Sequence, residues 1–441
     1  MRFSFDVSSD LLPGAKKIAS LLGCEVGEGG ITVKAMTAEA PGVSLSGGVA
    51  TIYYNKKNQF FREIGVLAEA AKKSDDFNIT ENNHFDMIGV MLQATYTVPT
   101  VASTKKLIDY LAVMGYDMLM LYTEYTLELD NRPYFGYMAG KYSDADIREI
   151  DDYCYSYGIE LIPCFECYGH MGGYLQWPEA ADIKDTADVM LARSEKTFAF
   201  LDEIMKKASA LFRSRRVHIG MDEAHSMGTG KFLEQNGYVE RSVIFVEYME
   251  RLAAICKSHG LTPMMWSDMY FRNSDPDRWY YNVGTKVPKT VRDKVTENVE
   301  LVFWHYGEDE GGEWDYMYKY VATTLKHLAV KSEIAEKLKP AYMAGDKATL
   351  THIKDVLFPE LYELTEAVYL ANKNAWMRDF KTLTAKILNA RYGFMKERIK
   401  TAIEFLDMYL SGELDKLEEL EEPRLKSKYF GFDNYQKIAG V

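Results

Sequence analysis

The alternation of apolar and polar segments from residue 84 onward limits the fold of this chain more than any other feature. Short apolar runs of strand length alternate with polar loops and with longer segments whose apolar residues recur at helical spacing. Strands and helices that alternate in this way form parallel sheets. The predicted strands are Met87–Gln93, Asp117–Tyr122, Glu160–Phe165, Arg216–Gly220, Pro263–Ser267 and Glu300–His305, and the predicted helices are Ser103–Met114, Asp144–Tyr157, Asp188–Phe212, Arg241–His259 and Lys289–Val295. We therefore expect an α/β fold, a TIM-type (β/α) barrel that is incomplete, with about six recognisable strands.

Most of these strands end in polar or aromatic residues, although packing in a barrel core gives a strand no reason to end that way. The ends are Tyr122-Thr-Glu124, Glu166, Asp222-Glu223, Trp266-Ser-Asp268 and Trp304-His-Tyr306. The carboxyl ends of parallel barrel strands form the rim that holds the active site in such folds. These residues are therefore the first candidates for a functional site.

The regions on either side of the barrel have different patterns. Residues 1–80 contain strand-like segments at Ile31–Ala35 and Gly48–Tyr54 and a helical pattern at Phe60–Lys73, which predicts a small α/β domain. The barrel is assigned to residues 81–312. Residues 313–441 have helical periodicity, with long stretches at Lys319–Leu338, His352–Met377 and Phe380–Leu410. We expect three parts: the small domain, the barrel and a helical C-terminal region.

Two adjacent carboxylates, Asp222 and Glu223, follow the predicted strand Arg216–Gly220. Repulsion between them is expected to raise the pKa of one carboxyl group, so that it remains a proton donor near neutral pH. Its partner would stay ionised and stabilise a developing positive charge. An Asp-Glu pair can instead cap the next helix. The preceding His218-Ile-Gly220 and the downstream segments favour the catalytic interpretation.

The pattern His218-x-Gly220-x-Asp222-Glu223 resembles the signature of glycoside hydrolase family 20, the exo-acting β-N-acetylhexosaminidases. In that family the substrate's own 2-acetamido oxygen attacks the anomeric carbon, which gives an oxazolinium ion and retained configuration. The resemblance implies that Glu223 protonates the leaving oxygen and later activates water, while Asp222 orients the acetamido N–H. It implies removal of terminal β-linked N-acetylglucosamine, or N-acetylgalactosamine, without a metal or organic cofactor.

The segment Ile162-Pro-Cys-Phe-Glu166-Cys-Tyr-Gly-His170 resembles the family's third-strand motif, which usually carries Asp and Pro-Gly-His. The resemblance implies that Glu166 and His170 form a pair that adjusts the pKa of the catalytic acid without touching the sugar. His218 is expected to support the catalytic residues in the same indirect way. A turn glycine beside a buried, hydrogen-bonded histidine would give the same pattern.

Trp266 and Tyr306 match the family residues that surround the acetamido group. The resemblance implies that the Trp266 ring walls the pocket and that the Tyr306 hydroxyl donates to the acetamido oxygen. The other residues assigned to sugar binding are Trp304, Glu308, Asp268, Glu124 and Gln93. Family members commonly place an arginine after the first strand to bind sugar hydroxyls. The segment Met91–Tyr96 has none, so Gln93 is the remaining candidate there.

The composition excludes some classes of binding partner. The net charge of −13 argues against nucleic acid and anionic membranes as partners, and no apolar run reaches the roughly 20 residues of a membrane span. The N-terminal residues lack the apolar stretch of a secretory signal. The five cysteines are an odd number in a large chain, which fits reduced thiols and a cytoplasmic location.

No second apolar strand with a polar or aromatic end follows Glu300–His305. We therefore expect the seventh and eighth barrel strands to be absent. Open sheet edges are normally covered, so we expect a homodimer with an interface near residues 304–340. Two alternative functions stay open: a barrel glycosidase that uses two protein carboxylates, and a catalytically weakened sugar-binding or scaffold protein.

Overall fold

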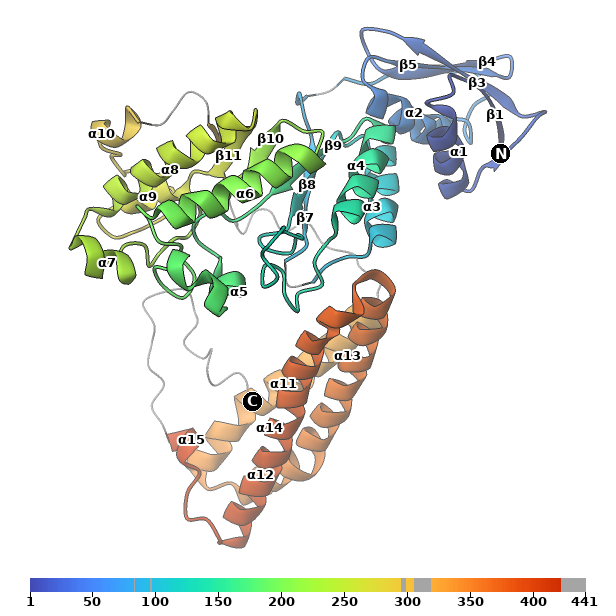
Figure 1. Ribbon diagram of the computed structural model, residues 1–441. Coiled ribbons are helices and arrows are strands. Elements are labelled where there is room, and N and C mark those ends of the chain that lie inside the picture. Colours follow the sequence, from blue (N-terminus) through green and yellow to red (C-terminus); the bar gives the residue numbers. More distant parts are fainter. Residues whose placement is uncertain (83, 96, 295–298, 305–318, 422–441) are drawn as a thin grey trace. The chain divides into compact units, whose positions relative to one another are not determined.

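The computed structural model describes residues 1–82, 84–95, 97–294, 299–304 and 319–421 (Figure 1). The chain divides into two compact units, Met1–His305 and Tyr306–Val441. The first unit contains two separate six-stranded sheets. The predicted division into three parts stays a prediction. Among the described residues, no helix combines the length and the apolar character that crossing a membrane requires.

The N-terminal sheet has the strand order β2-β1-β3-β5-β4-β6, and α1 and α2 lie against one face of it (Figure 1). Its elements are β1 (Arg2–Asp6), α1 (Leu12–Leu21), β2 (Glu25–Val26), β3 (Ile31–Thr37), β4 (Gly42–Ser46), β5 (Val49–Tyr54), α2 (Lys57–Ala70) and β6 (Phe77–Thr80). The two predicted strands and the predicted helix are confirmed as β3, β5 and α2. The sequence analysis missed α1 and the other strands, two of which, β4 and β6, are short antiparallel neighbours.

A fully buried carboxyl group, that of Glu63, lies on the packed face of α2. Burial, followed by the charge of Glu81, raises its pKa from 4.5 to about 8. The folded protein therefore keeps this proton to about pH 8, whereas the unfolded chain releases it near pH 4.5. Its contribution to stability is fully present below the lower value and is lost as the pH rises through the upper one.

We expect the Glu63→Gln variant to lose less thermal stability than the wild type between about pH 5 and pH 8.5, because the glutamine has no proton to release. Thermal unfolding followed by circular dichroism across this range measures the difference. Glu69→Gln, at an exposed position of the same helix, is the matched control and should follow the wild type. Parallel curves for wild type and Glu63→Gln would contradict the assignment.

The second sheet holds six parallel strands in the order β7-β8-β9-β10-β11-β12, so each strand pairs with its neighbours in sequence. The strands are β7 (Gly89–Gln93), β8 (Met118–Tyr122), β9 (Glu160–Cys164), β10 (Arg216–His218), β11 (Thr262–Trp266) and β12 (Glu300–Val302). All six predicted strands are confirmed, with ends that differ by at most three residues. Their shared register brings the carboxyl ends of β8, β9 and β10 together, because Tyr122 is opposite Cys164 and Cys164 is opposite His218.

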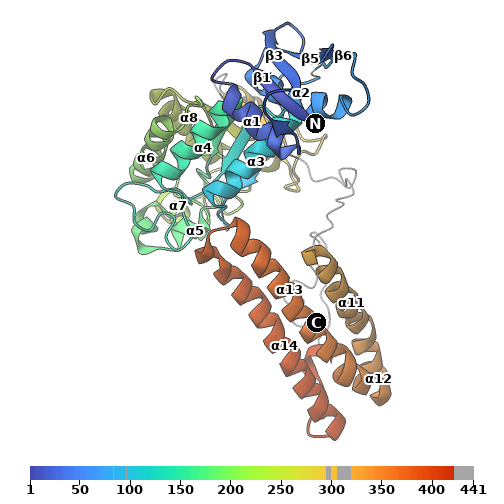
Figure 2. The same cartoon turned by 90° about the vertical axis from the view of Figure 1, so that its right-hand side faces the viewer.

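The principal helices follow one another along this sheet in the order α3, α4, α6, α8 (Figure 2). They are α3 (Val101–Met114), α4 (Asp144–Tyr157), α6 (Glu195–Leu211) and α8 (Arg241–Ser258), and the short helices are α5 (Gly172–Leu175), α7 (Lys231–Asn236), α9 (Asp268–Ser274) and α10 (Lys289–Arg292). The predicted start of α6 at Asp188 is wrong. Ser194 caps the helix by accepting from the Thr197 N–H, and Asp188 instead accepts a hydrogen bond from Ser226 Oγ at 3.0 Å.

Within the described part of the chain the sheet is open at both ends, since β7 and β12 each have one neighbour there. Among the described residues, no further strand extends it, and residues 319–421 contain helices rather than strands. The predicted incomplete barrel is confirmed. The segment that connects β12 to the helical unit, residues 305–318, lies outside the described residues.

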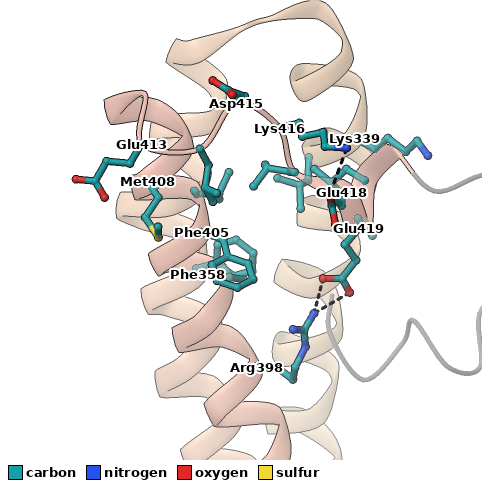
Figure 3. Close-up of a pocket in the computed structure, with 17 residues that line it drawn as sticks. Lys339, Phe358, Arg398, Phe405, Met408, Glu413, Asp415, Lys416, Glu418 and Glu419 are labelled. Atoms are coloured by element: carbon teal, nitrogen blue, oxygen red, sulfur yellow. Dashed lines mark hydrogen bonds and ion pairs between the residues drawn. The ribbon is translucent and has the colours of Figure 1, made fainter.

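The second unit is helical, as predicted, and has its own apolar core. Its helices are α11 (Lys319–Ala344), α12 (Lys347–His352), α13 (Phe358–Asp379), α14 (Lys386–Ser411) and α15 (Glu418–Glu421), with a π-helical turn at Ile353–Leu357. A cavity of about 700 Å³ lies between α11, α14 and the segment that ends in α15, and Phe358, Phe405 and Leu420 are among its lining residues (Figure 3). Arg398 and Glu419 pair at its edge at 2.7 Å.

Candidate active site

Asp222 and Glu223 follow β10 through a tight turn at the carboxyl edge of the parallel sheet. The turn requires a left-handed backbone at Gly220, Met221 and Glu223, with φ values of 67°, 78° and 47°. The side chains of Asp222 and Glu223 are about 16% and 34% exposed, although Asp222 Oδ1 is itself buried. The strand thus presents two adjacent acids where a small ligand can reach them.

Two glycines allow the chain to pack closely around this turn. A Cβ atom on Gly220 would lie 2.2 Å from Glu166 Oε2, so only glycine leaves room for the Glu166 carboxyl. A Cβ atom on Gly169 would lie 2.6 Å from the Asp222 carbonyl oxygen. The loop after β9 therefore packs directly on the turn that carries the two acids.

His170 lies between the two acids. Its Nε2 atom is 3.3 Å from Asp222 Oδ2 and 3.5 Å from Glu223 Oε2. Hydrogen bonds to Asp222 and then to Glu223 raise the pKa of His170 to about 11, so the ring is an imidazolium near neutral pH. The same contact is the main cause that lowers the pKa of Glu223. The expectation that repulsion between the two acids keeps one protonated therefore fails for Glu223, because the hydrogen bond from His170 lowers its pKa.

Glu223 has a second partner that sequence reasoning missed. The Tyr280 hydroxyl donates to Glu223 Oε1 at 3.0 Å, and the hydroxyl oxygen also contacts His225 Nε2. Burial and then the charge of Arg272 lower the pKa of His225, so His225 is neutral. The Tyr280 proton is already donated to the carboxylate, so His225 must carry its own proton on Nε2 and donate it to Tyr280. His170 and Tyr280 thus hold the Glu223 carboxylate, and His225 holds the Tyr280 hydroxyl.

Three protonatable groups lie behind the turn. The Tyr122 hydroxyl is 3.0 Å from both Glu124 Oε1 and Glu166 Oε1, but it has one proton to donate. Burial and then the charge of Asp222 raise the pKa of Glu166 well above its ordinary value, while burial raises that of Glu124 to about 7. We therefore assign a proton to Glu166, which donates to Tyr122, which in turn donates to Glu124.

The structure places Glu166 and Glu124 differently from the sequence-based expectation. Glu166 was expected to form a supporting pair with His170; its hydrogen-bond partner is instead the Tyr122 hydroxyl. Glu124 was assigned to sugar binding, but its side chain is buried under Tyr122. Closed off from solvent, it can tune the charge of the site but cannot reach a sugar in this conformation.

Asp268 also acts within the protein in this structure, although a sugar contact was expected. It is fully buried, and its Oδ2 accepts a hydrogen bond from the Glu223 backbone N–H at 3.2 Å. Burial and then the charge of Asp222 raise its pKa to about 7. Asp268 follows β11, so it ties the ends of two neighbouring strands together.

Aromatic rings surround the two acids. The Trp266 ring, partly buried, lies 4.4 Å from the ring of His218 between ring centres. His218 is fully buried and neutral, since burial lowers its pKa to about 4, and its Nδ1 accepts from the Gly220 N–H at 3.1 Å. Trp304 is 5.2 Å from Tyr280 and 5.7 Å from Tyr281 between ring centres. Trp266 and Trp304 thus belong to the same end of the sheet as Glu223.

The remaining assigned residues are less closely tied to this cluster. Gln93 ends β7 and donates to Thr95 Oγ1 at 3.1 Å. Tyr306 and Glu308 lie outside the described residues, so their assignment stays a prediction.

The described residues contain no group of three His, Cys, Asp or Glu side chains arranged to hold a metal ion. Cys164 and Cys167 are fully buried, and burial raises the pKa of both thiols well above the ordinary value, which keeps them protonated.

The fold and this cluster define a class of protein: a glycoside hydrolase built on a parallel βα sheet, with accessible acids at the strand ends and neutral acids behind them. The model of the glycosyl hydrolase family 20 catalytic domain matches residues 89–303, and that of the glycoside hydrolase 20C C-terminal domain matches residues 294–438. The chain belongs to glycoside hydrolase family 20.

Curated relatives share a limited part of the chain. Hexosaminidase D of Bos taurus is 27% identical over 177 residues, which are 38% of this chain and 48% of the relative. Beta-hexosaminidase subunit A2 of Dictyostelium discoideum is 27% identical over 135 residues, 28% of this chain and 25% of the relative. The chain thus spans between a quarter and half of the length of these relatives.

Solved structures share the fold. The exo-β-N-acetylglucosaminidase of Vibrio harveyi, solved with N-acetylglucosamine, has a TM-score of 0.55 at 16% identity and covers 69% of this chain and 54% of its own. The β-N-acetylhexosaminidase of Streptomyces coelicolor has a TM-score of 0.53 at 19% identity, covering 76% of this chain and 69% of its own.

Proposed function

We propose that this protein is a retaining exo-β-N-acetylhexosaminidase that acts by substrate-assisted catalysis on terminal β-linked N-acetylglucosamine, or N-acetylgalactosamine. The observation that carries the proposal is the accessible pair Asp222 and Glu223, held from one side by His170 and from the other by Tyr280. Membership of glycoside hydrolase family 20 supports the reaction class.

The state of the other acids favours this route over one with a protein nucleophile. A carboxylate nucleophile must be ionised and must touch the anomeric carbon. Glu166 and Asp268 are fully buried, Glu124 is nearly so, and burial raises the pKa of all three. Asp222 is accessible, but it contacts the same histidine nitrogen as Glu223, whereas a nucleophile must lie across the sugar from the acid. None of these described acids meets both requirements, which favours the substrate's own acetamido oxygen as the nucleophile.

In the proposed reaction Asp222 accepts the acetamido N–H and stabilises its positive charge as the acetamido oxygen bonds to the anomeric carbon. The bond to the leaving oxygen breaks, and Glu223 gives that oxygen its proton. The Glu223 carboxylate then takes a proton from the water that opens the ring intermediate. A bound sugar excludes water from Glu223, which raises its pKa and favours the protonated form that the first step requires.

A thiazoline analogue of N-acetylglucosamine, which mimics the cyclised intermediate, tests the proposal. We expect 4-nitrophenyl N-acetylglucosaminide to be hydrolysed and the thiazoline to inhibit competitively, with an inhibition constant far below the Michaelis constant. Hydrolysis without inhibition would instead favour a glycosidase with two protein carboxylates. Sugar binding without hydrolysis would favour a sugar-binding or scaffold protein, a reading that the open sheet makes physically reasonable.

His170 should set the pH dependence of this activity. Because its hydrogen bond is the largest cause of the low Glu223 pKa, we expect His170→Gln to raise that pKa. The fall of kcat/KM at high pH, where the acid loses its proton, should then move to higher pH. The pH profile of kcat/KM measures the shift. His259→Gln removes a histidine that pairs with Asp202 at 2.7 Å elsewhere in this unit, and it should leave the profile unchanged. An unmoved limb in His170→Gln would contradict the role.

We further propose a cytoplasmic location and a homodimer. All five cysteines are free and buried, which suits a reducing compartment. The exposed edge of β12 carries Leu301 and is followed by Phe303, 47% and 62% exposed, and such apolar edges are usually covered. The expected interface near residues 304–340 lies partly outside the described residues. Cell fractionation and light scattering test the two proposals, and a stable monomer in solution would contradict the second.

A further inference from the structure

Three arginines gather beside the candidate active site without a carboxylate partner. Arg241 begins α8, Arg272 lies in α9, which packs beside α8, and Arg278 follows α9 (Figure 1). All three are partly buried. In the part of the chain that the structure describes, none of them forms an ion pair. Glu240 is near Arg241 but accepts a hydrogen bond from the Tyr238 hydroxyl at 2.8 Å.

Two arginines at the other end of α8 differ from this group. Arg251 pairs with Glu195, and Arg193 pairs with Glu247 of α8 at 2.8 Å. The two ends of the helix therefore differ in how their arginine charges are balanced. Burial and then the charges of Arg278 and Arg272 lower the pKa of Arg241, so the other two cations disfavour the charge of Arg241. Positive charges held close together in this way are relieved when an anion binds among them.

The cluster is linked to the catalytic acid by direct contacts. The Arg272 guanidinium carbon lies 4.7 Å from the centre of the Tyr280 ring, and the Tyr280 hydroxyl is 3.0 Å from Glu223 Oε1. The backbone also ties the cluster together, since Arg272 donates to the Arg278 carbonyl oxygen at 2.5 Å. His170 contacts the other oxygen of Glu223, Oε2, at 3.5 Å. Arg272 is therefore one aromatic ring away from the acid, on the carboxylate oxygen that His170 does not contact.

We propose that Arg241, Arg272 and Arg278 form a subsite for an anionic group, a carboxylate or a sulfate, on the glycoside that this protein cleaves. The inference rests on the proposed function and names the substrate class. Planar guanidinium groups bind both anions through paired hydrogen bonds. The acids of the active site would repel an anionic substrate, so a separate cationic contact is needed to hold one. The anion belongs either to the leaving sugar or to the terminal N-acetylglucosamine.

Two matched pairs of substrates test the proposal. The first pair is N-acetylglucosamine β-linked to glucuronic acid or to glucose, which differ in one carboxylate on the leaving sugar. The second is 4-nitrophenyl N-acetylglucosaminide with or without a 6-sulfate. We expect kcat/KM to be on the order of tenfold higher for the anionic member of one pair. A preference in the first pair places the anion on the leaving sugar, and one in the second pair places it on the terminal sugar.

The variant Arg241→Gln should reduce that ratio toward one, and rising salt should do the same. Arg278→Gln tests the subsite by a second route if Arg241→Gln folds poorly. Arg251→Gln, on the same helix but paired with Glu195, is the matched control and should keep the wild-type ratio. A ratio of one or less in both pairs, or a ratio that Arg241→Gln and Arg278→Gln both leave unchanged, would overturn the proposal.

Failure of the proposed function would be recognised separately. If none of the four substrates is hydrolysed, calorimetry with the thio-linked, non-hydrolysable forms of the first pair and the thioglycosides of the second measures binding alone. Tighter binding of an anionic form that Arg241→Gln abolishes would support the subsite without the activity. Equal dissociation constants in both pairs would overturn the subsite.

Discussion

Replacing Glu223 by glutamine is expected to lower kcat/KM by about 10³-fold for substrates in which N-acetylglucosamine is linked to another sugar. The leaving oxygen of that sugar needs a proton as its bond breaks. The loss should be smaller for 4-nitrophenyl N-acetylglucosaminide, whose leaving group departs as a stable anion. The glutamine keeps the shape of the side chain and can still accept from Tyr280, so the change isolates the proton. Steady-state kinetics on both substrates measures the two losses.

Glu234→Gln, at an exposed position of α7, makes the same chemical change outside the cluster and should have no effect. Equal losses on the two substrates in Glu223→Gln would contradict the acid role. Thermal unfolding of both variants shows whether a loss of activity reflects chemistry or misfolding.

The second large effect is expected from Gly220→Ala. An alanine at this position needs a left-handed backbone at φ 67°, and its Cβ atom would meet the Glu166 carboxyl at 2.2 Å. Gly260→Ala provides a matched control, because Gly260 has φ 68° and nothing within 4 Å of the added atom. We expect Gly260→Ala to lower the free energy of unfolding by about 1 kcal/mol, the usual cost of the backbone alone. Gly220→Ala should lose considerably more and should also lose activity.

Urea unfolding of the two variants separates the clash from the backbone strain, since the strain is common to both. The buried Glu166 cannot move away easily, because Tyr122 holds it at 3.0 Å. Equal losses in the two variants would mean that the loop after β9 yields to the added methyl group and does not position the turn.

The parallel sheet was predictable from the sequence because each strand is a compact apolar run followed by an amphipathic helix. Asp222 and Glu223 could be located because they directly follow such a strand. Tyr280 and His225 could not be found, since Tyr280 is 57 residues from Glu223 in sequence and comes from a loop without periodicity. The small strands β2 and β6 were missed because none of their residues is fully buried, so they give no apolar pattern. Strand β4 is largely buried, but its five residues, GVSLS, include only two large apolar side chains.

The charge states were the least predictable part of the site. Sequence spacing shows that Asp222 and Glu223 are adjacent, and from this alone repulsion was expected to dominate. The outcome depends on His170, whose Nε2 reaches both acids only because Gly169 lets the loop after β9 pack against the Asp222 backbone. For Glu166 and Asp268, the pKa is raised, and the main cause is burial, which the sequence does not reveal.

The loops after three consecutive strands each hold a charged residue with a left-handed backbone: Glu124 after β8, His170 after β9 and Glu223 after β10, with φ of 50°, 53° and 47°. This conformation is unfavourable for side chains with a Cβ atom, and proteins keep it where function requires it. Glycine or asparagine at these positions would relax the backbone while removing the charge. A lineage released from selection for activity should therefore drift toward a more robust but inert fold, and a glycine at position 223 in a homologue would mark such a loss.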